Sequence, residues 1–342
     1  MLESELAFGV LVALARLGVA DLIAEAGRPL TSSELSEQTD ADPDRMARLL
    51  RTAAALGYLR TTHNAGYALT SEGALLRDLP GSLRPALLVA ADPLWRETIT
   101  NLGRAVLTGK AGTNISPYDY LTANPALARQ FQQFMAVRSA AAAAALAQRD
   151  FTQCQTVIDI GGGQGAMLST ILEAHPHLTG VLWEQESVAD IAVVAMAERG
   201  HADRCQIIAG DMIDNVPHGG QQAVYILSNI LHNLDDGQAH RVLSNVRAAA
   251  SNGPAQVWCV DMLINPYRAY VGTPAAELTD MRMMSLFLGG RERTSEEYLA
   301  LLINAGFPSP RIERLSGPMY LISSEVTPLS ADDAGPYAPS LL

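Results

Sequence analysis

The sequence of 342 residues has little basic charge and few cysteines. Its 24 Lys and Arg residues stand against 36 Asp and Glu residues, which gives a formal net charge of −12 at pH 7. Because binding to a nucleic-acid backbone depends on clustered Lys and Arg, this balance argues against a nucleic-acid partner. The three cysteines, Cys154, Cys205 and Cys259, lie far apart, in or after apolar runs. We therefore expect buried free thiols and a reducing, cytoplasmic setting.

The chain also lacks metal-binding spacings and targeting segments. The cysteines form no C-x-x-C pair and no two histidines have the separation of metal ligands, so we predict no metal site. The apolar N-terminus is interrupted by charged residues and has no basic stretch ahead of a long uncharged run, which predicts neither a signal peptide nor a membrane partner. Hydrophobic residues make up 48% of the sequence, enough for cores in roughly two domains.

What the chain does contain is a glycine loop within residues 156–165, Thr-Val-Ile-Asp-Ile-Gly-Gly-Gly-Gln-Gly. A β-branched run carrying Asp159 leads into the glycines, and an amphipathic stretch follows, which is typical of the opening of a nucleotide-binding α/β unit. Gly161, Gly163 and Gly165 give G-x-G-x-G instead of the dinucleotide pattern G-x-G-x-x-G. This spacing disfavours a nicotinamide cofactor, and Asp159 before the glycines, with an acid closing the next strand, suits S-adenosylmethionine. An ordinary strand–helix turn is the alternative.

From residue 151 onward, apolar strand-like runs alternate with helical patterns. The expected strands are 157–160, 180–183, 206–208, 223–227 and 256–260, and the expected helices are 167–174, 188–199 and 239–250. A pair at 311–315 and 319–323 predicts an antiparallel hairpin at one edge. Alternation of this kind predicts an α/β fold with a doubly wound, mostly parallel sheet.

Residues 1–95 have a different pattern, that of an all-α winged-helix domain with a small hairpin. Residues 6–26 carry leucines at helical spacing, and Thr31 with Glu34 forms a capping box that opens a short helix. Asp42-Pro43 opens the next helix, and a hairpin follows over 58–70. The fold is compatible with DNA binding, but the surrounding acidic residues favour a dimerisation module.

The remaining segments complete the predicted organisation. Residues 96–150 are helical in pattern, and we interpret them as a linker and pocket wall. Within them, Asn124 is the expected N-cap of a helix and Pro125 its first residue. Residues 151–326 form the predicted cofactor-binding catalytic domain. Residues 327–342, rich in Pro, Asp and Ser, are expected to be a loose tail.

Polar side chains follow the predicted parallel strands at the point where each strand ends. In such sheets, ligands bind beyond the carboxyl ends of the strands. Glu184 lies about 25 residues after Asp159, near the position from which an acid holds ribose hydroxyls. Single acids after strands are often helix caps, but several in register with a glycine loop predict a cofactor site. The candidate cofactor-binding residues are Asp159, Gly161, Gly163, Gly165, Glu184, Gly210, Asp211, Met212 and Ser228.

The order of these motifs resembles the S-adenosylmethionine-dependent small-molecule O-methyltransferases of bacterial secondary metabolism, a family related to the plant caffeate-type enzymes. The resemblance covers nearly the whole chain and rests on the motifs Leu17-Gly-Val-Ala-Asp21, Arg48-Leu-Leu-Arg51, Leu56-Gly57, Asp159-Ile-Gly-Gly-Gly-Gln-Gly165, Gly210-Asp211, Leu231-His232, Gly289-Gly-Arg-Glu-Arg-Thr294 and Ala305-Gly-Phe307. It implies a class I methyltransferase (Rossmann-like) fold, a homodimer joined through the N-terminal domain, and a small-molecule acceptor bound between that domain and the cofactor domain.

The resemblance also implies a catalytic pair. His232 matches the family's general base, and Glu292 matches the acid that orients it. The alternatives are that His232 only packs after its strand and that Glu292 is an ion-paired residue at a helix start. The chain departs from the family's usual His-Asp-Trp with His232-Asn233-Leu234, and Ser228 stands where many relatives carry lysine.

The acceptor pocket is assigned by the same resemblance. The helix carrying Asp280, Met281 and Met284 corresponds to one that lines the pocket in the family. Phe131 and Met135, with Trp95, are the candidates for the opposite wall. An apolar lining of this kind suits a flat aromatic or polyketide-like acceptor.

Several functions remain open from the residues alone. The leading hypothesis is methylation of a hydroxyl on a small aromatic natural product. The alternatives are C- or N-methylation or a non-methylating reaction on the same scaffold, a winged-helix regulator that senses an adenosyl ligand, and a nicotinamide dehydrogenase. The net charge disfavours the regulator, and the glycine spacing disfavours the dehydrogenase.

Overall fold

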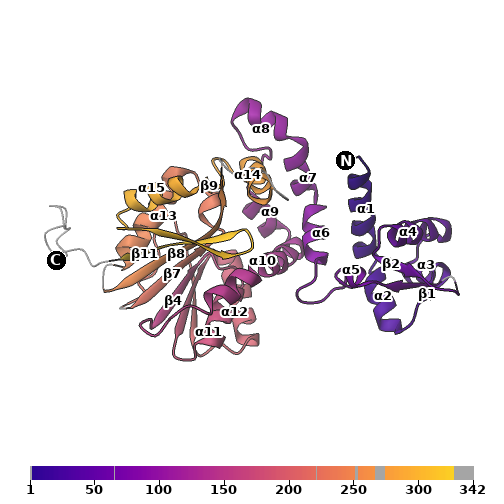
Figure 1. Ribbon diagram of the computed structural model, residues 1–342, viewed down its shortest axis with the longest axis horizontal. Helices are drawn as coiled ribbons and strands as arrows, with labels where there is room; N and C mark the ends of the chain where they lie inside the picture. Colours follow the sequence, from indigo (N-terminus) through magenta and orange to yellow (C-terminus); the bar gives the residue numbers. More distant parts are fainter. Residues whose placement is uncertain (1, 65, 221, 251–252, 266–273, 327–342) are drawn as a thin grey trace. The chain divides into compact units, whose positions relative to one another are not determined.

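The computed structural model describes residues 2–64, 66–220, 222–250, 253–265 and 274–326, and Figure 1 shows the elements along the chain. Two compact units are present, one formed by Met1–Arg96 with Ala123–Arg138 and the other by Glu97–Thr122 with Ser139–Leu342. Helices from the predicted linker therefore contribute to both units. The predicted loose tail, 327–342, lies outside the described residues.

The first unit is mostly helical and carries a small antiparallel sheet. Its strand order is β1-β3-β2, so the predicted hairpin is present and a two-residue strand joins it. Its elements begin with α1 (Leu2–Arg16), α2 (Val19–Ala26), β1 (Leu30–Thr31), α3 (Ser32–Thr39), α4 (Pro43–Ala55), β2 (Leu59–Thr61) and β3 (Gly66–Leu69). Their core contains Leu14, Val19, Leu35, Met46, Leu50 and Leu76.

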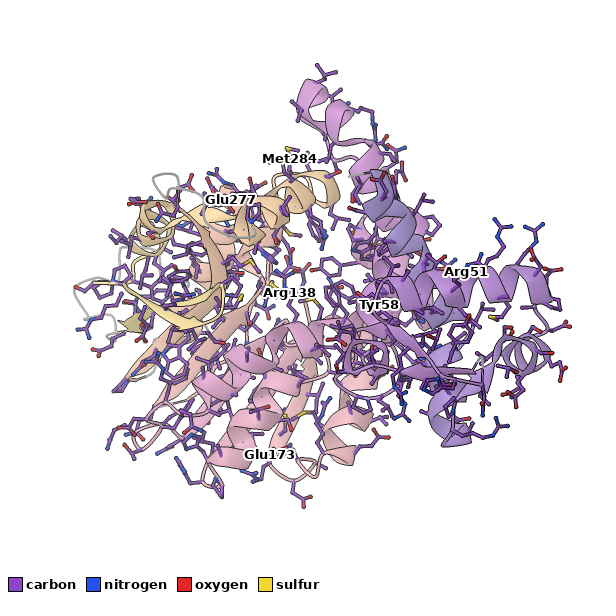
Figure 2. All side chains as sticks on the ribbon, turned by 45° about the vertical axis from the view of Figure 1, so that its right-hand side comes forward. Arg51, Tyr58, Arg138, Glu173, Glu277 and Met284 are labelled. Carbon is purple, nitrogen blue, oxygen red and sulfur yellow. The ribbon has the colours of Figure 1, made fainter. Side chains whose placement is uncertain are left out.

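The two predicted helix starts in this unit are confirmed. The Glu34 amide donates to Thr31 Oγ1 over 3.2 Å and the Thr31 amide donates to Glu34 Oε2 over 2.7 Å, which is the reciprocal capping box. The Arg45 amide donates to the Asp42 side chain, and Pro43 occupies the first turn of α4. Figure 2 shows Arg51 further along this helix.

The prediction of one helix over 6–26 was wrong. The segment is divided into α1 and α2 by Gly18, whose φ of 65° places it in the left-handed region where glycine is strongly favoured. Among the described residues no single helix is long and apolar enough to cross a membrane. Within the ranges that the structure describes, one bent pair, α1 with α2 at an angle of 52°, meets the length and composition of a span.

Residues 71–146 are largely helical, which includes most of the segment 96–150 that was predicted to be helical. Prolines begin three of these helices, where their missing amide proton costs no helical hydrogen bond. The helices are α5 (Ser71–Ala74), α6 (Arg84–Ala90), α7 (Pro93–Thr100), α8 (Leu102–Thr108), α9 (Pro117–Ala123) and α10 (Pro125–Leu146).

The second unit is built on an eight-stranded sheet with the order β10-β11-β8-β7-β4-β5-β6, and β9 pairs with β8. Strands β4 to β8 are parallel, and β11 runs antiparallel to β8 and β10, so the predicted edge hairpin is confirmed. The strands are β4 (Thr156–Ile160), β5 (Thr179–Glu184), β6 (Cys205–Ala209), β7 (Ala223–Ser228), β8 (Ala255–Ile264), β9 (Arg293–Thr294), β10 (Arg311–Ser316) and β11 (Met319–Val326).

Helices cover both faces of this sheet, as a doubly wound fold requires (Figure 1). Successive strand residues point to opposite faces, so Ile158 and Val157 belong to separate hydrophobic clusters. The cluster of Ile158 includes residues of α13 and α15, and that of Val157 includes residues of α10, α11 and α12. The helices are α11 (Ala166–Ala174), α12 (Glu186–Glu198), η1 (Leu231–Asn233), α13 (Asp236–Ala249), α14 (Ala275–Leu286) and α15 (Ser295–Asn304).

Candidate functional site

The strand order places a topological switch point between β4 and β7. After β4 the chain adds β5 and β6 on one side, and it returns to β4's other side with β7. Ligands in open α/β sheets bind in the crevice that opens where the order reverses. The glycine loop after β4 and the segment 229–235 after β7 both flank this edge. The fold therefore brings the glycine loop and the segment that carries His232 to the same edge of the sheet, although they are about 65 residues apart in the sequence.

The glycine loop is a cradle that side chains would fill. Gly161, Gly163 and Gly165 have φ values of 69°, 60° and 72°, in the region that favours glycine. A Cβ at Gly161 would collide with the side chain of Ile230, which follows β7. The Gly161 amide donates to the Trp183 carbonyl over 2.7 Å, which ties the start of the loop to β5. A ligand can therefore approach the backbone closely here.

Glu184 closes the end of β5 beside this loop. Its Oε2 accepts from the Gly163 amide over 2.9 Å and its Oε1 from the Gln185 amide over 2.8 Å. Burial raises the pKa of the carboxyl, and among the described residues no Lys or Arg pairs with it. An acceptor-only group held in this way suits hydroxyl donors such as those of a ribose, so the site fits an adenosyl cofactor.

Asp159 lies beneath the loop and is only 1% exposed. A Cβ on Gly162 would collide with its carboxylate, so the acid supports the underside of the glycine turn. Burial first, and then the charge of Glu184, raise the pKa of Asp159 to about 7, while the Leu168 amide opposes the rise. This placement favours a supporting role for Asp159 over direct contact with a ligand.

Replacing Asp159 with Asn is expected to stabilise the protein at pH 8 more than at pH 5. A carboxyl whose folded pKa exceeds its unfolded value takes up a proton on folding between about pH 4 and 7, so stability falls as pH rises through that window. At about 1.4 kcal/mol per pKa unit, the ionised group costs up to about 4 kcal/mol, and the amide recovers part of it. Thermal unfolding at both pH values measures the difference.

Asp190→Asn, on the exposed face of α12, is the matched control and should leave the melting temperature unchanged at both pH values. An equal loss of stability in Asp159→Asn at pH 5 and pH 8 would contradict the argument, because it would indicate a favourably bound carboxylate.

The other predicted cofactor residues follow the neighbouring strands. The Gly210 amide donates to the Glu184 carbonyl, and a Cβ there would collide with the Trp183 ring. Asp211 is exposed, and its Oδ1 accepts from the Ile213 amide over 2.8 Å. Met212 packs against the core, with its methyl group near the space that a Cβ on Gly161 would occupy. These residues lie at the same edge as the glycine loop.

Ser228 ends β7, and its Oγ accepts from the Asn229 side-chain amide over 3.1 Å. Asn229 itself adopts a φ of 55° and is 5% exposed. A buried non-glycine residue in this conformation marks a sharp turn out of the strand. The turn directs the following residues, including His232, back over the strand ends.

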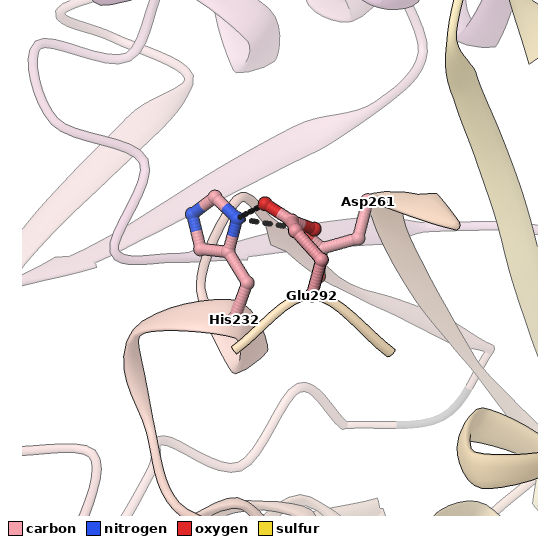
Figure 3. Close-up of side chains that lie close together, drawn as sticks. All are labelled: His232, Asp261 and Glu292. Atoms are coloured by element: carbon pink, nitrogen blue, oxygen red, sulfur yellow. Dashed lines mark hydrogen bonds and ion pairs between the residues drawn. The ribbon is translucent and has the colours of Figure 1, made fainter. Parts of the chain in front are cut away.

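The predicted catalytic pair is in contact. His232 Nδ1 lies 2.8 Å from Glu292 Oε1, and the two side chains are almost fully buried (Figure 3). His232 lies in η1 after β7, whereas Glu292 precedes β9, sixty residues later in the chain. The Glu292 amide in turn donates to Asp280 Oδ1 over 2.9 Å. The side chain of Asp280 therefore anchors the segment that carries Glu292.

A third acid, Asp261, belongs to the same cluster and was not predicted. Its Oδ1 lies 3.6 Å from His232 Nδ1, and its Oδ2 accepts from the Tyr298 hydroxyl over 2.6 Å. Burial raises the pKa of Asp261 to about 6, with Glu292 adding to the rise and His232 opposing it. The available signal was an acid inside the apolar run of β8, where an ionised side chain is costly without a partner.

One side-chain nitrogen or oxygen from each of His232, Asp261 and Glu292 lies within 4.8 Å of the other two. The spacing of these residues in the sequence did not predict this cluster. Two acceptor-only carboxylates facing one imidazole nitrogen fix a proton on that nitrogen. They also stabilise the charged ring that forms when the second nitrogen takes up a proton. The arrangement is therefore suited to accepting a proton from a bound molecule.

The predicted acceptor residues divide between the two units. Met284 on α14 is partly buried and Met281 is 39% exposed, and Figure 2 shows Met284 on the same helix as Glu277. Phe131 and Met135 lie on α10 in the first unit, where the Phe131 ring centroid is 5.7 Å from that of Trp95. Their placement opposite α14 stays a prediction.

The chain matches two family models. Residues 100–308 match an O-methyltransferase domain, and residues 2–77 match an O-methyltransferase dimerisation domain. It is 34% identical over 306 residues to the phenazine O-methyltransferase PhzM of Lysobacter antibioticus, covering 87% of this chain and 86% of the relative. It is 32% identical over 302 residues to a phenazine-1-carboxylate N-methyltransferase of Pseudomonas aeruginosa, covering 87% of each.

A solved structure agrees with these matches. The crystal structure of LaPhzM superposes with a TM-score of 0.86 at 30% sequence identity and covers 96% of this chain and 97% of its own. The similarity in sequence thus covers 87% of this chain, and the similarity in fold covers 96%. The chain belongs to the O-methyltransferase family and is an S-adenosylmethionine-dependent methyltransferase with an N-terminal dimerisation domain.

Proposed function

We propose that this enzyme methylates a hydroxyl group on a small aromatic or polyketide-like molecule, with His232 as the general base. The observation that carries the proposal is the buried contact of 2.8 Å between His232 Nδ1 and Glu292 Oε1, with Asp261 at 3.6 Å. A hydroxyl must lose its proton as it attacks a methyl group, and a positioned imidazole contributes typically 10²–10⁴-fold to such a step.

The chain's own residues divide the work of proton transfer. S-adenosylmethionine, when bound, supplies a methyl group activated by its positively charged sulfur. In this proposal the protonated Nδ1 of His232 donates a hydrogen bond to Glu292. The basic nitrogen is then Nε2, on the far side of the ring in Figure 3. Nε2 would take the proton that the acceptor's hydroxyl gives up when its oxygen displaces the sulfur from the methyl carbon. Glu292 and Asp261 stabilise the resulting imidazolium.

The cofactor residues are assigned by their place at the switch point. Gly161, Gly163 and Gly165 allow a close approach of the backbone, and Glu184 accepts from ribose hydroxyls. We assign recognition of the adenine to Asp211 and Met212, which follow β6. The acid would accept from the adenine's amine, and the thioether would pack on its ring. Gly210 and Ser228 border the same edge, and Asp159 supports the loop from below.

The acceptor and the assembly are part of the same proposal. We assign contacts with the acceptor to Asp280, Met281 and Met284 on α14 and to Phe131 and Met135 on α10. The match of residues 2–77 to a dimerisation domain supports a homodimer, and the acidic composition argues against a nucleic-acid partner. The three buried free cysteines support a cytoplasmic enzyme. N-methylation is the second candidate, since some of the relatives are N-methyltransferases.

The test is methyl transfer by the purified protein. With methyl-labelled S-adenosylmethionine, we expect label in a subset of hydroxylated phenazines, naphthoates and benzoates, and none in their methyl ethers. The amine analogues of the same ring systems are assayed in parallel. Label in the amines alone would replace the proposal with N-methylation, and failure of S-adenosylhomocysteine to bind in calorimetry would overturn the cofactor assignment as well.

A further inference from the structure

Tyr118, on α9, reaches the strand ends from a segment that precedes the sheet by almost forty residues. Its hydroxyl lies 3.0 Å from the side-chain nitrogen of Asn233, the residue that follows the proposed base. Its ring packs on Phe287 with centroids 5.6 Å apart. Burial and then the nearby charge of Glu184 raise the pKa of the phenol well above its ordinary value. Asn233 follows β7 and Glu184 ends β5, and these two strands lie on either side of β4. The contact with Asn233 therefore places Tyr118 at the edge of the sheet where the glycine loop begins.

The orientation of the Asn233 amide is determined by its second contact. The same nitrogen, Nδ2, also lies 3.2 Å from the backbone carbonyl of Asn229. A carbonyl only accepts hydrogen bonds, so the atom that faces it must be the amide nitrogen and not the amide oxygen. The two protons of Nδ2 are then directed to the Asn229 carbonyl and to the Tyr118 hydroxyl oxygen.

This arrangement determines the direction of the next hydrogen bond. Because the Tyr118 oxygen accepts from Asn233, its own proton is turned toward another acceptor. Among the described residues no acceptor is bonded to that proton, and Glu184 is the nearby anionic group that influences the phenol. A group that both donates and accepts, placed between Glu184 and Tyr118, would satisfy both side chains. A ribose hydroxyl has this chemistry.

We propose that Tyr118 is a further cofactor-binding residue, whose hydroxyl donates to a ribose hydroxyl of the adenosyl cofactor, and that Asn233 makes it a donor. The ribose hydroxyl donates its own proton to Glu184. Asp at 233, which the resemblance gives as the family's usual residue, would accept the phenol's proton and remove the donor. The proposal rests on the cofactor assignment above and concerns residues outside the proposed proton-transfer cluster.

The experiment is calorimetric binding of two ligands to the full-length protein. Both S-adenosylhomocysteine and 5′-methylthioadenosine carry the adenine and the ribose, but only S-adenosylhomocysteine carries the amino-acid end. Tyr118→Phe retains the ring that packs on Phe287. We expect it to weaken the binding of both ligands by the same factor, about five- to tenfold, which corresponds to the loss of one hydrogen bond. Asn233→Asp is expected to weaken both to a similar extent. The double variant should lose little more than either single one, because both remove the same bond.

Tyr320→Phe, on β11, removes a partly buried hydroxyl elsewhere in the same unit and should leave both affinities unchanged. Unchanged binding by Tyr118→Phe would overturn the proposal, and so would a loss limited to S-adenosylhomocysteine, since the acceptor would then be the amino-acid end. Equal affinity of Asn233→Asp and wild type would overturn the role of Asn233. If the wild type bound neither ligand, the cofactor assignment itself would fail.

Discussion

Replacing His232 with Ala is expected to lower kcat for methylation of a hydroxyl acceptor by about 10²–10⁴-fold, the usual contribution of a positioned general base. The affinity for S-adenosylhomocysteine should stay within about twofold, because the proposed cofactor contacts come from the glycine loop and Glu184. Initial rates of methyl transfer and calorimetric binding measure the two effects separately. The loss should appear in kcat because the proton is transferred only as the bond to carbon forms.

His240→Ala is the matched control, since this histidine is exposed on α13 and contacts none of the proposed site residues. It should retain the full rate. A His232→Ala variant that also retains the full rate would exclude His232 as the base. If the acceptor were an amine, the loss would be much smaller, because the nitrogen lone pair attacks without prior removal of a proton.

The two acids that face His232 should differ in importance. Glu292→Gln preserves the size of the partner at 2.8 Å but removes its charge, whereas Asp261→Asn does the same at 3.6 Å. We expect the larger fall in kcat for Glu292→Gln, because an electrostatic interaction weakens with distance. The combined variant should fall short of the product of the two single effects, as expected for groups that act on one ring.

The sequence predicted the framework well because the framework depends on local patterns. Alternating apolar strands and helices predicted the parallel sheet, and the glycine loop predicted the turn after β4, whose three left-handed residues require glycine. The capping box at Thr31 predicted the start of α3 because both its hydrogen bonds are local. The helix over 6–26 failed at Gly18, where a single left-handed residue outweighed a continuous apolar periodicity.

The site was predicted only in part because its contacts are distant in sequence. His232 and Glu292 are sixty residues apart, and their pairing followed from resemblance to a family, not from spacing. Asp261 lies inside a buried strand, and only the pairing of β8 with β7 brings it to the imidazole. Tyr118 lies 115 residues before Asn233, so no local pattern indicates their contact.

Removing the Arg293 guanidinium is expected to cost more stability than any other substitution at the site. The side chain is 1% exposed and donates to the carbonyls of Leu231 and Leu234, over 2.6 and 2.9 Å, on either side of His232. It also donates twice to Asp236 Oδ1. Arg293→Met leaves the two carbonyls without this donor, and each buried acceptor left unsatisfied costs about 1–3 kcal/mol. Asp236 is 64% exposed, so water replaces the contact to its carboxylate. Thermal unfolding should show a fall of several degrees.

Arg293→Lys separates stability from catalysis. A lysine keeps the charge but cannot reach both carbonyls with a planar fork, so it should recover part of the melting temperature while kcat stays below that of the wild type. The physical reason is that the guanidinium, by binding the carbonyls of Leu231 and Leu234, holds η1 in place, and η1 carries the imidazole of His232. Arg241→Met, at an exposed position on α13, controls for the loss of a positive charge and should change neither quantity. If Arg293→Met melted at the wild-type temperature, the buried guanidinium would not be what holds η1, and the position of His232 would need another support.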